Sequence, residues 1–346
     1  MSGARAALAG LSAFLLALVV AAPASASFPY TRSGGDPSDP TDLYLDAGTV
    51  PTDLGGNEFK FAATPDPANT VNNLLPVELG GVRGAHVVDD DASVSTAFRT
   101  TTGRPDVTIA ILDSGIKWND AGAMTDLRKK TRLSKGELPK PRNDGLGTPN
   151  EPGADCSGGG PFTHAGDWDL NGDAVFNVID YACDNRVQRD TPKGVGPAGV
   201  LEPQDILIAF SDGVDDDGNG YVDDIVGWDF LDNDNDPFDD VQYGHGTGEA
   251  RDSTAEADNG GDVGSCPNCM GIYLRVGDSF IGDVNRFGAA VTYATDNDAQ
   301  IVQEALGTLN NASLAREDLG GPKPVARNRM REIQRLPAVL PLRNWR

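Results

Sequence analysis

The chain has 346 residues, 39% of them hydrophobic, and a formal net charge of −24. This length suits one large domain or two small ones, and the apolar fraction is sufficient for a core. The strong negative charge argues against a surface that binds phosphate groups, so nucleic acid is not an expected partner.

Residues 1–26 have the pattern of a secretory signal peptide. Arg5 precedes an apolar run over residues 11–20, and Ala24, Ser25 and Ala26 supply small residues for cleavage. We expect cleavage after Ala26 and a secreted, extracellular protein with no membrane segment. An uncleaved membrane anchor is the alternative, although the run is short for a membrane span.

A buried strand with a carboxylate at its end is predicted early in the chain. Residues 27–100 mix Gly, Pro and Asp and form an N-terminal extension. Residues 107–112 are apolar and β-branched, as in a buried parallel strand, and Asp113 and Gly115 follow. Because open α/β sheets keep their chemistry at the carboxyl ends of strands, Asp113 is a candidate catalytic residue.

Residues 127–204 form a long insertion rich in Gly, Pro and Asp, with a first acidic loop inside it. Oxygen-bearing side chains occupy positions 1, 3, 5, 9 and 12 of an EF-hand-like spacing: Asp169, Asn171, Asp173, Asn177 and Asp180. Ala174 stands at position 6, where glycine normally makes the turn. The loop can be interpreted either as a structural calcium site or as a loop that binds no metal.

A second acidic loop follows residues 205–210, which we interpret as a strand. Its oxygen-bearing side chains are Asp215, Asp217, Asn219, Asp223 and Asp224. Gly220 is placed for the sharp turn, but Val226 at position 12 offers no oxygen, so Asp224 or a carbonyl would complete a calcium shell. A solvated acidic turn is the alternative. A third acidic run, residues 229–240, is expected to fix the start of the next helix.

A histidine between two glycines follows. The order Gly244, His245, Gly246, Thr247 suits a histidine at the start of a helix that faces Asp113. The sequence contains three histidines, His86, His164 and His245, and no two of them are spaced as a helical ligand pair, so catalytic zinc is not predicted.

The four cysteines, in an exported protein, predict disulfides. They allow three pairings, of which Cys156 with Cys183 and Cys266 with Cys269 is favoured. Redox catalysis by Cys266 and Cys269 would require a preceding strand, but residues 258–265 are glycine-rich and polar. A structural disulfide, or a pair of thiols, is therefore preferred.

The remaining pattern alternates strands and helices. Residues 270–276 and 299–306 have strand character, and residues 284–293 have helical spacing. Together these elements predict an α/β fold with a mostly parallel sheet flanked by helices.

Two motifs resemble those of the subtilisin-like serine proteases, or subtilases. They are Leu112, Asp113, Ser114, Gly115 and Gly244, His245, Gly246, Thr247, in the order of that family, and residues 101–312 are identified as a partial peptidase domain. The resemblance implies a subtilisin-like fold in which Asp113 orients His245 and His245 takes the proton of a serine. The chain departs from the family at residues 248–251, which read Gly, Glu, Ala, Arg.

The resemblance carries further implications. Subtilases commonly have a prodomain where residues 27–100 lie, and many bacterial members have an acidic run before the histidine motif, which favours structural calcium. Leu306 and Gly307 resemble the segment that binds an extended substrate as an added strand. A buried core strand ending at a glycine is the alternative for these two residues.

The expected nucleophile is missing from the sequence. Ser253, Ser265, Ser279 and Ser313 are the serines after His245, and none follows a Gly-Thr pair. From residue 313 onward, eight Lys and Arg face three Asp and Glu, and prolines recur. We hypothesise a shifted reading frame in this basic tail, with a natural end as the alternative. The peptidase domain is then truncated before its serine and incomplete at the C-terminus.

Two functions follow from these expectations. The first is a secreted, calcium-stabilised serine endopeptidase by family, inactive in this chain. The second is a secreted calcium-binding pseudoenzyme that binds a peptide or an inhibitor. A polypeptide is the expected partner in both, and the oligomeric state is left open.

Overall fold

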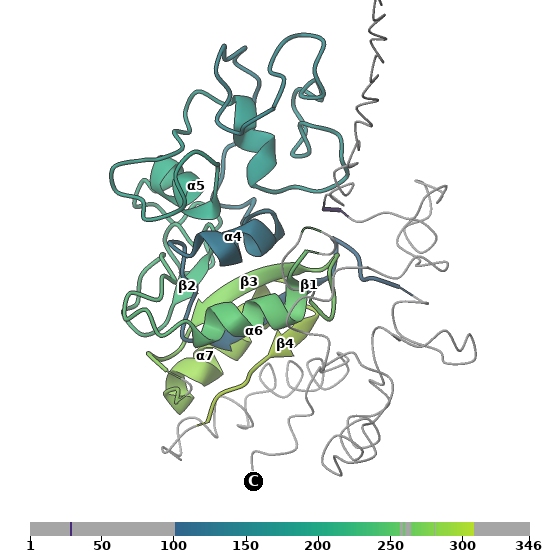
Figure 1. Cartoon of the computed structure of the whole chain (residues 1–346). Coiled ribbons are helices and arrows are strands. Elements are labelled where there is room, and N and C mark those ends of the chain that lie inside the picture. The colour runs from purple at the N-terminus through teal and green to yellow at the C-terminus, as the bar shows by residue number, and fades with distance from the viewer. Residues whose placement is uncertain (1–27, 30–100, 257–258, 260–263, 280, 308–346) are drawn as a thin grey trace, which may run out of the picture.

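The computed structural model describes residues 28–29, 101–256, 259, 264–279 and 281–307. Its centre is a four-stranded, all-parallel sheet in the order β2-β3-β1-β4. The strands are β1 (Thr108–Asp113), β2 (Gly227–Asp229), β3 (Met270–Arg275) and β4 (Ile301–Gln303). The predicted α/β fold with a parallel sheet flanked by helices is confirmed at this level (Figure 1).

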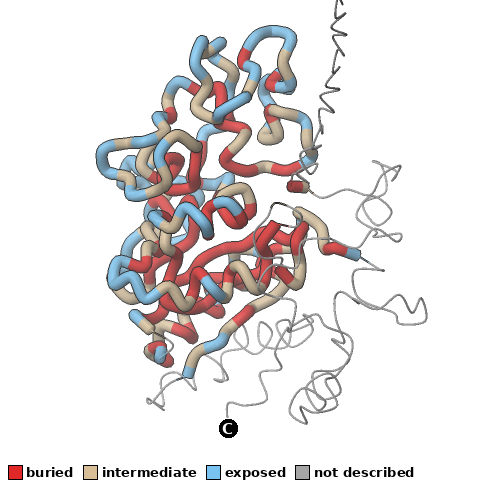
Figure 2. The backbone as a smooth tube through the Cα atoms, viewed as in Figure 1, coloured by how far each residue is buried: buried red, intermediate tan, exposed pale blue. Residues whose placement is uncertain are grey.

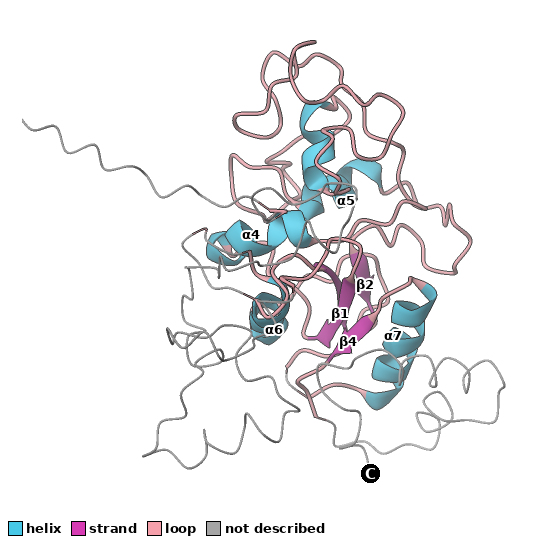
Figure 3. Ribbon diagram, turned by 90° about the vertical axis from the view of Figure 1, so that its right-hand side faces the viewer, coloured by secondary structure: helices cyan, strands magenta, loops and turns pink. Residues whose placement is uncertain are grey.

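Helices cover both faces of the sheet (Figure 3). On one face lie α4 (Ala121–Leu127) and α6 (His245–Thr254), and on the other lies α7 (Val284–Asp296). The side chains of β1 alternate between these layers: Ile109 and Ile111 pack in the cluster with α4 and α6, and Ala110 and Leu112 pack in the cluster with α7. This period of two explains why the whole strand is apolar, because both of its faces are buried.

The carboxyl ends of the strands place polar residues along one edge of the sheet. Asp113 pairs in register with Arg275, which in turn pairs with Asp229, and Ile111 pairs with Gln303. Gly115 then turns the chain with φ +90°, and a Cβ there would lie 2.3 Å from the carbonyl oxygen of Pro237. A side chain is therefore excluded where β1 leaves the sheet.

The long insertion lies beyond α4, on the side away from the sheet (Figure 1). It begins with η3 (Arg128–Lys130) and contains η4 (Val178–Cys183), and α5 (Pro203–Phe210) starts at its end. A small cluster around the Cys156–Cys183 disulfide forms its outer part, whereas Tyr181 and Ile206 join the main core. The buried segments in Figure 2 accordingly run from the sheet into the insertion.

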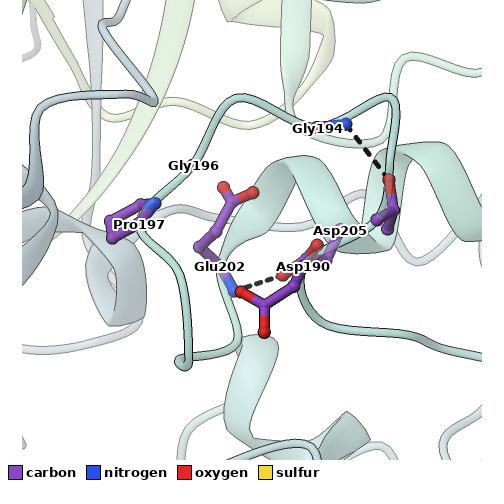
Figure 4. Close-up of a pocket in the computed structure, with 7 residues that line it drawn as sticks. Asp190, Gly194, Gly196, Pro197, Glu202 and Asp205 are labelled. Carbon is purple, nitrogen blue, oxygen red and sulfur yellow. Dashed lines mark hydrogen bonds between the residues drawn. The ribbon is translucent and has the colours of Figure 1, made fainter.

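The prediction of a strand at residues 205–210 is wrong, because these residues lie in α5. Pro203 occupies the first helical turn, where its missing N–H costs nothing. The Glu202 carboxylate accepts from the backbone N–H of Gln204, and the Asp205 carboxylate accepts from that of Glu202 (Figure 4). This reciprocal capping starts a helix in a short apolar run that periodicity alone does not distinguish from a strand.

The other predicted elements appear with shifted bounds. The run at residues 270–276 is β3, the helical spacing at 284–293 is part of α7, and the run at 299–306 contributes only the three residues of β4. Predictions for the signal peptide, for residues 30–100 and for the basic tail lie outside the described residues. Among the described helices, none has the length and apolar character needed to cross a membrane.

Candidate functional site

Asp113 and His245 meet at the carboxyl edge of the sheet. The Nδ1 atom of His245 lies 2.8 Å from Oδ1 of Asp113, although the two residues are 132 positions apart in the sequence. Asp113 is the last residue of β1, and His245 is the first residue of α6. The two motifs singled out in the sequence are therefore joined by a hydrogen bond.

The start of α6 packs directly against the end of β1. The backbone N–H of Gly246 donates to the hydroxyl oxygen of Ser114 at 3.0 Å, and Thr247 accepts from the backbone N–H of Lys117 at 2.8 Å. A Cβ at Gly246 would lie 2.4 Å from the carbonyl oxygen of Gly115 and 3.0 Å from the Cβ of Asp113. Glycine is therefore required here for the helix to bring His245 within reach of Asp113.

A carboxylate from the third acidic run holds the first turn of this helix. Asp239 is fully buried and accepts from the backbone N–H groups of Gly244 at 2.5 Å and Tyr243 at 3.1 Å, and from the Ser114 hydroxyl at 3.3 Å. A negative charge at a helix N-terminus is favoured by the helix dipole. The run was expected to fix the start of the helix, but the sequence did not indicate Asp239 as the residue responsible.

The environment of the pair sets its chemistry. Burial raises the pKa of the Asp113 carboxyl, and hydrogen bonds from His245 and the Ser114 backbone oppose that rise. When the Asp113 carboxylate is ionised it can only accept hydrogen bonds, which assigns a proton to Nδ1 of His245 and leaves Nε2 as the nitrogen that can accept one. Tyr243 stacks on the ring with centroids 5.8 Å apart. The arrangement can take a proton at Nε2.

The first acidic loop is organised by its own carboxylates. Asp169 accepts from the backbone N–H groups of residues 172, 173 and 174, at 2.7, 3.1 and 2.8 Å. Asp180 is buried and accepts from those of residues 170, 171 and 177. Ala174 has φ +70°, the conformation that glycine would normally supply. Burial raises the pKa of Asp180 to about 7, and it also raises the pKa of Asp173.

The remaining oxygen ligands of this loop also lie within it. Asn171 accepts from the Asp173 backbone and donates to the Asp173 carboxylate, and Asn177 caps η4 through the backbone N–H of Ile179. The structure therefore brings Asp169, Asn171 and Asp173 together at one turn, while Asn177 and Asp180 pair in the capping of η4.

The second acidic loop repeats the turn of the first, residue for residue. Asp215 accepts from the backbone N–H groups of residues 218, 219 and 220, at 2.7, 3.1 and 2.9 Å. Asp217 accepts from that of Asn219, as Asn171 accepts from that of Asp173. Gly220 has φ +95° at the position equivalent to Ala174. Two segments of different sequence thus share one loop conformation.

The second loop gathers three carboxylates, one of which the sequence did not indicate. Oxygen atoms of Glu137, Asp217 and Asp224 lie within 4.8 Å of one another. Oδ2 of Asp224 accepts from the Tyr293 hydroxyl at 2.6 Å, but its buried Oδ1 has no hydrogen-bond partner among the described residues. Burial raises the pKa of Asp224 to about 6, with Asp217 among the charges that add to it. A buried carboxylate oxygen that accepts no hydrogen bond is a suitable ligand for a hard cation such as calcium.

Asp223 is directed elsewhere. It has φ +56°, and its carboxylate accepts from the backbone N–H groups of Asp212 and Gly213, both at 2.9 Å. It does not belong to the group formed by Glu137, Asp217 and Asp224. Glu137 was missed because it lies 80 residues before Asp217, and the only local signal for it was a glutamate after a glycine.

The third acidic run surrounds a cation of the protein itself. Arg275, only 3% exposed, pairs with Asp229, Asp232, Asp240 and Asp278 at 2.8, 3.3, 2.7 and 2.6 Å. These ion pairs connect the segment leading to α6 with the end of β3. They support the expectation that this run has a positioning role.

Leu306 and Gly307 lie just after β4. Gly307 forms a parallel bridge with Ile281, and its carbonyl accepts from the backbone N–H of Gly282 at 2.9 Å. Leu306 packs against the cluster that contains α7. The backbone of Gly307 is thus already paired on one side by residues 281 and 282.

The four cysteines form two disulfides, Cys156–Cys183 and Cys266–Cys269. These are the pairs favoured from the sequence. The second bridge lies against Gly103, where a Cβ would approach the sulfur of Cys266 to 2.2 Å. The bridge thus lies immediately before β3, at the end of the sheet opposite Asp113.

No family model and no curated protein sequence matches this chain. Its function is therefore inferred from the residues and geometry described above.

Proposed function

We propose that the chain derives from a secreted serine endopeptidase of the subtilisin-like type, in which Asp113 orients His245 and His245 is the general base. The observation that carries the proposal is the 2.8 Å hydrogen bond between Nδ1 of His245 and Asp113 at the carboxyl edge of a parallel sheet. A carboxylate on Nδ1 leaves Nε2 to take a proton from a hydroxyl, which is the division of roles in a Ser-His-Asp triad.

Structural calcium is part of this proposal. In the second acidic loop, Glu137, Asp217 and Asp224 would hold the ion, since their oxygens converge and one of them is buried without a donor. In the first loop the matching turn at Asp169 supports a second ion. Calcium would neutralise carboxylates whose charged forms are disfavoured by burial, and it would connect residue 137 to a loop 80 residues further along.

The second candidate function is binding of a peptide or protein inhibitor without hydrolysis. It is favoured by one observation, that no Gly-Thr-Ser sequence follows His245 in the 346 residues. In that case the Asp113–His245 pair would be retained without a nucleophile, and the segment at Leu306 would contribute the binding edge.

A serine-directed covalent probe, together with a peptidase assay on the secreted protein, tests the proposal. We expect neither labelling nor hydrolysis by the 346-residue chain, since the groups of a triad act as a unit. If the wild type is labelled and the His245→Ala variant is not, our inference that this chain has no nucleophilic serine is wrong.

The Asp113–His245 pair is tested separately by the proton NMR signal of the His245 Nδ1 hydrogen. A signal shifted by hydrogen bonding, and lost in Asp113→Asn, is expected. Its absence from a folded protein would remove the basis for the peptidase assignment. Tight binding of a peptide-mimicking inhibitor without hydrolysis would favour the second function.

A further inference from the structure

A second carboxylate lies on the other side of His245. Glu249, one helical turn further along α6, has its Oε1 atom 3.9 Å from Nε2 of His245. That distance is too long for a hydrogen bond. Since Asp113 occupies Nδ1, the imidazole ring lies between two carboxylates, and the second is next to its basic nitrogen.

Gln303 holds this second carboxylate in place. Its side-chain nitrogen donates to Oε2 of Glu249 at 2.5 Å, and its side chain is fixed in β4, where Gln303 is only 4% exposed. The amide oxygen of Gln303 is buried and has no hydrogen-bond partner within the described part of the chain. That oxygen belongs to the same amide group whose nitrogen binds Glu249.

We propose that His245 and Glu249 bind a divalent transition-metal ion of the zinc class, with the amide oxygen of Gln303 as an additional donor. On a tetrahedral zinc ion the two ligand atoms lie about 3.3 Å apart, so rotation of these partly exposed side chains would have to bring Nε2 and Oε1, now 3.9 Å apart, slightly closer together to share one ion. Residues four apart on a helix face the same side, which is why this spacing recurs in zinc sites.

The surroundings favour this class of metal. The carboxylate of Asp113 is hydrogen-bonded to Nδ1, and such a carboxylate commonly orients a metal-binding histidine and strengthens it as a ligand. Calcium prefers oxygen donors only, so an imidazole ligand selects for zinc, cobalt or nickel. The side chains of His245 and Glu249 are 26% and 22% exposed, which leaves room for water in the other coordination positions.

The inference does not depend on the proposed peptidase activity. A metal on Nε2 would occupy the electron pair that a general base uses, so the two roles of His245 exclude each other at one moment. No two histidines of the sequence are spaced as a helical ligand pair. The pair found here consists of a histidine and a glutamate, at the position where the motif departs from that of subtilases.

Cobalt(II) titration of the full-length secreted protein, saturated with calcium, tests the site. We expect one cobalt ion per chain, a visible absorption band from nitrogen and oxygen ligands, and displacement by zinc but not by calcium. Glu249→Gln should weaken cobalt binding at least tenfold. Asp113→Asn should weaken it by about 10-fold to 100-fold, because the carboxylate that orients the histidine ligand is lost. His164→Gln is the matched control and should bind as the wild type does.

A second measurement keeps the test independent of the variants. Zinc added to the unmodified protein should shift the NMR signals of the His245 ring and leave those of His164 unchanged. The proposal is overturned if cobalt binds Glu249→Gln as tightly as the wild type, or if zinc leaves the His245 signals in place. Because both readouts are binding, a lack of peptidase activity affects neither.

Discussion

At the scale of single residues, the position of His245 depends on the absence of a side chain at Gly246. Gly246→Ala would place a methyl group 2.4 Å from the carbonyl oxygen of Gly115, so α6 must move away from β1. We expect a loss of about 1–3 kcal/mol in the free energy of unfolding, as for other overpacked sites. The Nδ1 proton signal of His245 should weaken as its distance from Asp113 increases. Urea unfolding and NMR measure the two effects.

Gly248 is the matched control for that substitution. It lies two residues further along the same helix, and a Cβ there meets no atom within 4 Å. Gly248→Ala should raise the free energy of unfolding by about 0.4–1 kcal/mol, because alanine is the better helix former. Equal destabilisation by both substitutions would show that the contact with Gly115 is not the determinant.

The residues that sequence reasoning identified differ physically from those it missed. Asp113 and His245 each stand in a local pattern, a buried strand followed by a turn and a histidine between glycines, so each could be found alone. Glu137 accepts from the backbone N–H groups of Asp217 and Asp223, which lie far along the chain. Asp239 accepts from the backbone N–H of Gly244, within an irregular turn. No periodicity marks such contacts, because they exist only after the chain has folded.

At the scale of elements, the two acidic loops share a turn but differ in how they are completed. The second loop is completed by Asp224 and by Glu137 from a distant segment, whereas Asp223 is used to hold residues 212 and 213. We expect calcium to raise the melting temperature of the wild type and chelation to lower it. Asp224→Asn should remove most of the shift contributed by this loop, because it removes the charge at the buried end of the group.

Asp223→Asn provides the comparison for the second loop. It should lower the melting temperature, because Asp223 is buried and accepts two backbone hydrogen bonds, but it should keep the wild-type response to calcium. Differential scanning calorimetry with and without a chelator measures both. A calcium response that survives Asp224→Asn intact would contradict the assignment of Glu137, Asp217 and Asp224 as ligands.

The central strands β1 and β3 were predictable, whereas the three-residue strand β2 and the insertion were not, for a physical reason. The strands of a parallel sheet are buried on both faces, so β1 and β3 appear as continuous apolar runs. In the insertion, structure is created by capping and by the Cys156–Cys183 bridge, and the apolar run of α5 has no polar interruptions. The glutamate, proline and aspartate at its start, Glu202, Pro203 and Asp205, were the signal for a helix.

At the scale of the whole molecule, a net charge of −24 is combined with carboxylates placed in the interior. Glu202 and Asp205 are both buried at the start of α5, and they line a small pocket with Asp190 (Figure 4). Burial raises the pKa of Glu202 to about 8, and the charge of Asp205 adds to it. Burial likewise raises the pKa of Asp205 to about 6. These two groups belong to neither acidic loop, so they test the effect of acid apart from that of calcium.

The sign of the resulting pH dependence follows from proton binding. In the unfolded chain Glu202 titrates near pH 4.5, whereas in the folded protein it holds its proton to about pH 8. Between these values the folded state binds more protons, so the free energy of unfolding falls as pH rises. Glu202→Gln keeps an acceptor for the backbone N–H of Gln204 but cannot ionise. We therefore expect the variant to be more stable than the wild type at pH 8.5, by about 1 kcal/mol or more, and to lose that advantage near pH 4.5. Urea unfolding at the two pH values decides the matter, since a difference that is constant with pH would mean that Glu202 does not change its ionisation on folding.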